Sequence, residues 1–151
     1  MAEVKSRQSA LVEATKKVLP TDAHGRRRII VITTPATFTA ALNDTMGSGA
    51  VVPPGARFTA NSSVSCAAGA ASSTLSIGFR HPDTKAVFDA TAIASGVDIA
   101  AAGQKTANNG TKVANGIEHV TSQAVEPYIT FTGAAPQANQ AVRVEIEYVL
   151  D

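Results

Sequence analysis

The chain has 151 residues, the length of one domain that buries about two-thirds of its unfolded surface. Thirteen Lys and Arg against twelve Asp and Glu leave a net charge of +1, which does not indicate bulk nucleic-acid binding. No window approaches 18 consecutive apolar residues, and a single cysteine, Cys66, cannot form an internal disulfide. Composition therefore excludes a membrane-spanning helix, a coiled coil and a disulfide scaffold, and we expect no secretory signal and no membrane partner.

The residue types favour β-structure. The sequence contains 15 Val and 9 Ile but only 5 Leu, together with 28 Ala, 16 Thr and no Trp. Because β-branched side chains pack well on a pleated surface, whereas Leu is the usual residue of a helix core, this ratio predicts an all-β chain.

Charge divides the chain into two parts. Residues 1–28 hold seven basic and three acidic side chains, a net charge of +4, and the remaining residues carry a net charge of −3. Residues 9–19 have the pattern of a short helix that Pro20 would end, and such a helix is marginal in isolation. We predict an N-terminal arm over residues 1–24 and a β-domain over residues 25–151.

Alternating apolar and polar residues recur along the predicted domain, each run bounded by turn residues. The predicted strands are 28–34, 37–42, 57–66, 74–80, 86–89, 117–121, 128–132 and 141–150. Residues 90–116 are rich in Ala, Gly and Asn, which predicts a long excursion with one helical turn at 91–94. Residues 133–140 are interpreted as a hairpin connection between the last two strands. The spacing predicts an antiparallel β-sandwich or jelly roll.

The search for chemistry finds no catalytic motif, so we expect no enzyme, no cofactor and no metal. Glu145 and Glu147 share one face of the last strand, which predicts two solvated carboxylates rather than an acid–base pair. Cys66 lies in an alternating run and is interpreted as a buried structural thiol. The histidines are far apart in sequence and are expected at the surface or in turns: His24, His81 and His119.

The main cluster of charge is Gly25-Arg26-Arg27-Arg28. It has three interpretations: the solvated start of a strand, an electrostatic contact to an acidic protein surface, or a nucleic-acid contact. The last is not expected, because no aromatic residue is interleaved with the arginines to stack on bases. The residues predicted to contact a protein partner are Lys16, Lys17, Arg26, Arg27 and Arg28.

Several short motifs occur in a characteristic order. Gly25-Arg26-Arg27-Arg28 is followed by Leu42-Asn43-Asp44-Thr45, by Pro53-Pro54-Gly55-Ala56-Arg57-Phe58, by Ser73-Thr74-Leu75-Ser76-Ile77-Gly78-Phe79 and by a final alternating strand over Val142 to Val149. Over residues 8–151 this order resembles small virion structural proteins of tailed bacteriophages, of the kind that decorate or cement the capsid. The third arginine, Arg28, and the run Asn108-Asn109-Gly110 depart from the family pattern.

The resemblance implies a non-enzymatic protein, made in the bacterial host cytoplasm, that binds the major capsid protein on the outer surface of the capsid. It implies a homo-oligomer, with a trimer favoured, and carries over no catalytic residue. Two alternatives stay open. One is another virion component, such as a tail, fibre-base or head–tail junction protein. The other is a carbohydrate-binding or hydrolytic jelly roll, which the absence of Trp disfavours because sugars stack on aromatic faces.

Overall fold

The computed structural model describes Ala14 and residues 25–150 of the chain, and the predicted arm otherwise lies outside the described residues. These residues contain ten strands and no helix. The strands are β1 (Arg26–Thr33), β2 (Thr45–Gly47), β3 (Arg57–Phe58), β4 (Ser63–Cys66), β5 (Thr74–Arg80), β6 (Val87–Asp98), β7 (Gly103–Thr106), β8 (His119–Val120), β9 (Glu126–Thr132) and β10 (Val142–Leu150).

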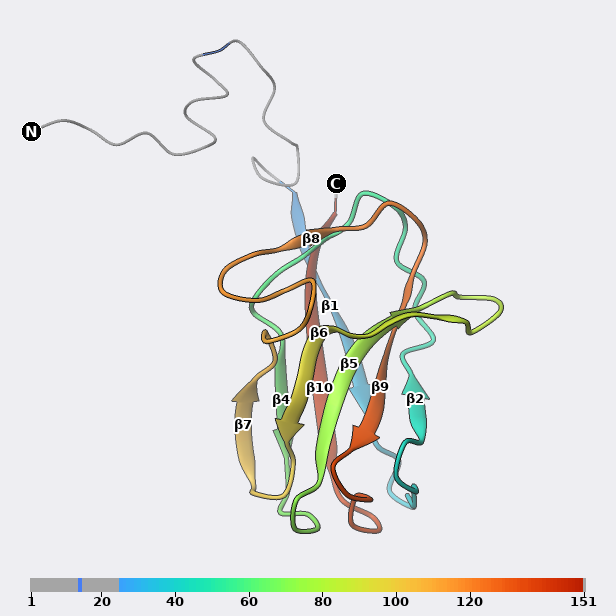
Figure 1. The fold of residues 1–151 in the computed structure, drawn as a ribbon, viewed down its shortest axis with the longest axis vertical. Coiled ribbons are helices and arrows are strands. Elements are labelled where there is room, and N and C mark those ends of the chain that lie inside the picture. The colour runs from blue at the N-terminus through green and yellow to red at the C-terminus, as the bar shows by residue number, and fades with distance from the viewer. Residues whose placement is uncertain (1–13, 15–24, 151) are drawn as a thin grey trace, which may run out of the picture.

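The strands form two antiparallel sheets. The larger sheet is centred on β10, which pairs along one side with β1 and along the other side with the two short strands β4 and β3. β7 then pairs with the outer side of β4, and β8 pairs with the outer side of β3. The smaller sheet has the order β2-β9-β5-β6. Figure 1 shows β5, β6 and β9 in front of β1 and β10. The all-β antiparallel sandwich is confirmed, and the jelly-roll variant stays a prediction.

Alternation along the strands builds the core between the sheets. In β10, Val142, Val144 and Ile146 are at most 2% exposed, and in β5 Leu75 and Ile77 are fully buried. Both sets match the inward faces predicted from the sequence. Aromatic contacts join the layers, since the Phe58 ring of the larger sheet lies 4.6 Å from the Phe79 ring of the smaller one.

The region between residues 90 and 116 was predicted wrongly as an excursion with a helical turn. β6 runs for 12 residues through Thr91–Ala94, and β7 follows it. Small residues can form these strands because backbone hydrogen bonds and close packing stabilise the strands. Large apolar side chains, whose alternation is the signal used to predict strands from the sequence, are not needed.

Two connections also differ from the prediction. Residues 37–42 form no strand, because the Phe38 N–H bonds the Asn139 side chain (2.9 Å) and its carbonyl accepts from the Asn139 N–H (2.7 Å). Residues 133–140 do not close a hairpin, because β9 and β10 belong to different sheets. Periodicity indicates which face of a strand is buried, but not which strand is its neighbour.

Candidate functional site

The predicted contact arginines lie at the start of β1, at the end of the molecule where β10 finishes (Figure 1). Arg26, Arg27 and Arg28 are all exposed. Lys16 and Lys17 lie outside the described residues. The structure therefore brings three of the five predicted residues together on one strand.

Arg27 is held by a buried carboxylate. Its Nη2 lies 2.6 Å from Oε2 of Glu147, whose Oε1 accepts hydrogen bonds from Thr59 Oγ1 (2.7 Å) and Asn61 Nδ2 (3.0 Å). Burial opposes the charged carboxylate, but the hydrogen bonds from Thr59, Asn61 and Arg27 outweigh it and hold the pKa of Glu147 below its ordinary value. The prediction that Glu147 is solvated was wrong, since the residue is only 9% exposed.

Arg26 and Arg28 carry the remaining charge of the cluster. Within the part of the chain that the structure describes, neither makes an ion pair, and both side chains are exposed. Because strand side chains alternate, these two arginines point to the opposite face of the sheet from Arg27. They are the two residues of the cluster without an ion-pair partner among the described residues.

The rest of β1 presents apolar side chains to solvent. Ile29 is 58% exposed and Val31 is 41% exposed, on the same outer face as Arg27. Arg143 and Glu145 of β10 flank them and pair with each other (2.7 Å). A basic group and an apolar pair therefore lie within one strand length, beside an Arg143–Glu145 pair whose charges already satisfy each other, which is the chemistry of a protein-binding surface.

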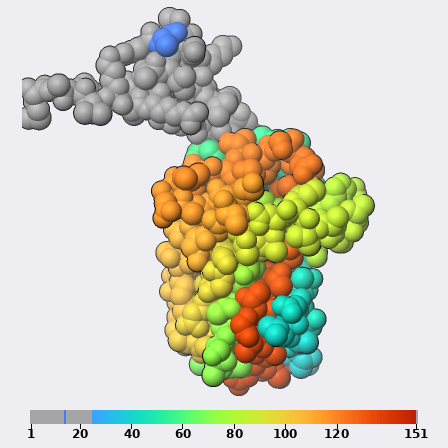
Figure 2. All heavy atoms as spheres, in the orientation of Figure 1, coloured from blue at the N-terminus to red at the C-terminus, as the bar shows by residue number. Residues whose placement is uncertain are grey.

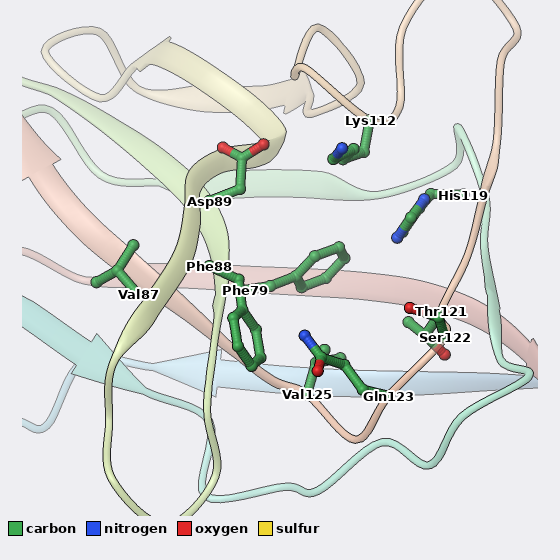
Figure 3. Close-up of a pocket in the computed structure, with 10 residues that line it drawn as sticks. All are labelled: Phe79, Val87, Phe88, Asp89, Lys112, His119, Thr121, Ser122, Gln123 and Val125. Carbon is green, nitrogen blue, oxygen red and sulfur yellow. The ribbon is translucent and has the colours of Figure 1, made fainter.

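A second candidate is a cavity of about 430 Å³ near β8 and the start of β6. Figure 3 shows the Phe79 and Phe88 rings between Asp89 and Lys112 on one side and Gln123 and Val125 on the other. Apolar and polar side chains both line the cavity, which suits binding of a small group.

The polar groups of this cavity do not form an acid–base pair. Asp89 accepts hydrogen bonds from the Thr91 N–H (2.9 Å) and from the Thr111 hydroxyl, and these outweigh the effect of burial and lower its pKa. His119 stacks on Phe79 with ring centroids 5.9 Å apart. Burial, and to a lesser degree the nearby Lys112, lower the pKa of His119 below its ordinary value.

The other histidines and the cysteine have local roles where the structure describes them. His81 Nδ1 accepts from the N–H groups of Asp83 and Thr84 (both 3.3 Å), as expected of a turn residue, and His24 lies outside the described residues. Cys66 is half-buried rather than buried, with Sγ 3.4 Å from the Ala101 carbonyl. Within residues 25–150, no group of three His, Cys, Asp or Glu is placed to hold a metal.

An ion network around Glu126 was not predicted from the sequence. This side chain accepts from Arg80 Nη2 (2.9 Å) and Nε (3.1 Å), from Lys85 Nζ (2.5 Å) and from the Gly49 N–H (3.2 Å). The Arg80 guanidinium is the main cause that lowers the pKa of Glu126 to about 2, against the opposing effect of burial. The only sequence signal was a charged residue at the head of an apolar strand.

Comparison with known proteins finds no matching family model and no matching curated protein. Among solved structures, the fold is similar to a chain titled "Cyanophage Pam1 capsid asymmetric unit", with 15% sequence identity and a TM-score of 0.46 over 100% of both chains. None of the described residues forms a helix of the length and apolarity needed to cross a membrane.

Proposed function

We propose that this chain is a bacteriophage virion structural protein that decorates the outer surface of the capsid. In this proposal the major capsid protein is the partner, and the chain bridges neighbouring capsomers without catalysing a reaction. The observation that carries the proposal is the start of β1, where Arg26 and Arg28 are exposed and make no ion pair among the described residues.

The charge distribution supports a protein partner rather than nucleic acid. The basic cluster is confined to one end of a domain whose remaining residues are slightly acidic, and the neighbours of the arginines along β1 are aliphatic. Aliphatic neighbours provide no stacking surface for bases, whereas an arginine beside apolar side chains is typical of protein interfaces.

The motifs that carry the resemblance have structural positions in this fold. Pro54-Gly55 forms a turn in which Gly55 has a φ of +86°, a conformation that favours glycine, and the chain then enters β3. The Ser73–Phe79 motif is almost coextensive with β5, and the final alternating motif is β10. Motifs with structural positions of this kind support a binding role rather than a catalytic one. If many copies of the chain each make a modest contact with the capsid lattice, avidity makes their combined attachment tight.

The test is co-sedimentation of the purified full chain with capsids that lack it. Arg26→Ala together with Arg28→Ala should weaken binding by about tenfold, and by no more than about thirtyfold, and should reduce its salt dependence, since each exposed charge contributes up to ~1 kcal/mol. Arg143→Ala is the matched control, because Arg143 is an exposed arginine of the same sheet that is already paired with Glu145. It should leave binding within about twofold of the unsubstituted protein.

Imaging the chain in the virion distinguishes the competing assignments. Decoration predicts that the chain lies on the capsid surface at repeated lattice positions. A position in the tail, the fibre base or the head–tail junction would replace this proposal with the alternative virion role. The mass of the free protein distinguishes the homotrimer that the resemblance implies from a monomer or a dimer.

A further inference from the structure

β1 differs from every other sheet edge among the described residues in being both long and uncovered. It has eight residues, whereas the edge strands β2, β7 and β8 have three, four and two. The long edge strand β6 is partly covered, because the carbonyls of Thr91 and Ala92 accept from the N–H groups of Thr111 and Lys112 (both 2.9 Å). Native proteins usually shorten or cover such edges, because an open edge pairs with other chains.

The hydrogen-bond pattern shows which groups of β1 are open. The Thr34 N–H donates to the Val142 carbonyl (3.0 Å), so the even-numbered residues before it turn their backbone groups toward β10. Arg27, Ile29, Val31 and Thr33 therefore direct four N–H and four carbonyl groups away from β10. Among the described residues, none of these groups has a hydrogen-bond partner.

Beyond its three arginines, which are confined to one end, the strand lacks the features that discourage pairing. Its register with β10 is continuous through eight residue pairs, with no bulge and no proline. Its outer face carries Ile29 and Val31, both well exposed, in the middle of the open edge. A regular, apolar, unpaired edge is a template for another strand.

We propose that β1 pairs antiparallel with β1 of a second copy, about a twofold axis at Ile30. This register places Ile29 opposite Val31 and Arg27 opposite Thr33 of the other copy. All four outward-facing residues of each strand then form hydrogen-bonded pairs, which gives eight interchain hydrogen bonds. A shift of two residues in either direction leaves only three such pairs and six bonds.

The charges favour the antiparallel arrangement of two copies over a parallel one. The Arg26–Arg28 clusters of the two chains lie at opposite ends of the joint ladder, and the two Arg27 residues are six positions apart, about 20 Å. This distance exceeds the Debye length of about 8 Å at physiological salt, so repulsion is screened. The Ile29 and Val31 side chains of both copies meet at the centre and cover one another. The contact does not depend on the capsid proposal.

The first test is the mass of the full chain by sedimentation across a concentration series. We expect a particle of twice the 15.5 kDa chain mass. Val31→Pro removes an outward N–H without removing a hydrogen bond to β10, and should raise the dimer dissociation constant at least tenfold. Val31→Ala is the matched control, because it shortens the same side chain but keeps the N–H, and should have a smaller effect.

Two further variants keep the test decisive. Ile29→Lys changes only an exposed side chain and should also give monomers, even where the proline variant fails to fold. In a Cys66→Ala background, a mixture of Arg27→Cys and Thr33→Cys chains should form an interchain disulfide on oxidation, whereas either variant alone should not.

A monomeric wild-type protein, a trimer unaffected by Val31→Pro, or equal crosslinking of the single variants and the mixture would each overturn the pairing. If the wild type is monomeric and Val31→Pro abolishes capsid binding, the edge accepts a capsid strand and the self-pairing is wrong.

Discussion

Glu126 is the most enclosed carboxylate among the described residues, only 2% exposed. It joins three separate segments, because Arg80 belongs to β5, Lys85 to the turn that follows and Gly49 to the loop after β2. Arg80 also lies over the Tyr128 ring, 5.2 Å from its centroid. The network therefore fixes the base of the β5–β6 hairpin, whose tip projects from the body in Figures 1 and 2.

We expect Glu126→Gln to lower the free energy of unfolding by about 3 kcal/mol, because it leaves the mostly buried Arg80 guanidinium without its charged partner. Urea denaturation measures the change. Glu145→Gln is the control, since the Arg143–Glu145 pair is exposed and its loss should cost less than about 1 kcal/mol. Equal effects of the two substitutions would contradict a structural role for Glu126.

The stabilisation that the Glu126 network provides should also depend on pH. The folded pKa of Glu126, about 2, lies below its ordinary value of 4.5, so its stabilisation is complete above about pH 4.5 and is lost as the pH falls toward 2. This difference corresponds to about 3 kcal/mol. The lowered pKa values of Asp89 and Glu147 act in the same direction. Glu126→Gln should therefore flatten the acid limb of a plot of stability against pH.

At the scale of elements, β5 and β10 could be predicted from the sequence because their apolar residues alternate without interruption. β6 could not, since its second half consists largely of small residues whose burial depends on the packed neighbours. Residues 37–42 show the opposite failure. They alternate like a strand, yet Phe38 packs on Phe131 at 5.3 Å while Leu42 remains 47% exposed, because this segment crosses between the sheets.

The candidate site was predictable in part for a related reason. A run of arginines before an apolar strand is visible in the sequence, and the structure places Arg26, Arg27 and Arg28 together on β1. The open edge and the burial of Glu147 were not predictable, because both depend on which strands are neighbours. The Glu147 side chain is shielded from solvent near Thr59 and Asn61, which hydrogen-bond its carboxylate and lie more than 80 positions away in the chain.

The pairing of β5 with β6 depends on Gly78. A Cβ at this position would lie 2.3 Å from the Asp89 carbonyl oxygen, where the register between the two strands shifts. We expect Gly78→Ala to lower the free energy of unfolding by about 2–3 kcal/mol through this backbone clash. Thermal unfolding measures it, with Gly55→Ala as the control.

Gly55 has a φ of +86° but no atom within 4 Å of the added Cβ. Its substitution should therefore cost only the backbone strain, about 1 kcal/mol. If Gly78→Ala lowers the free energy of unfolding by less than Gly55→Ala, then β5 and β6 can move apart to accommodate the added methyl group at little cost in stability.

For the whole molecule, the residues that form the core differ from the exposed residues of β1 that are proposed to contact a partner. The core lies between the two sheets and does not use the exposed side chains of Arg26, Arg28, Ile29 or Val31. β1 still contributes to the sandwich through its inward residues Ile30 and Ile32, so the strand proposed to bind the capsid is rigidly supported. Surface substitutions on β1 should therefore weaken the proposed attachment while the domain remains folded.

This separation leads to a prediction for the proposed role in the virion. Capsids stripped of the protein should rupture at a lower temperature or under a milder osmotic shock than decorated capsids, because contacts that bridge capsomers are lost. Adding the full chain back should restore resistance. The Arg26→Ala, Arg28→Ala protein should do so only at higher concentration, because it folds normally but attaches weakly. Release of the packaged genome during a temperature ramp provides the measurement, with Arg143→Ala as the control. Equal resistance of stripped and decorated capsids would show that the chain does not cement the shell.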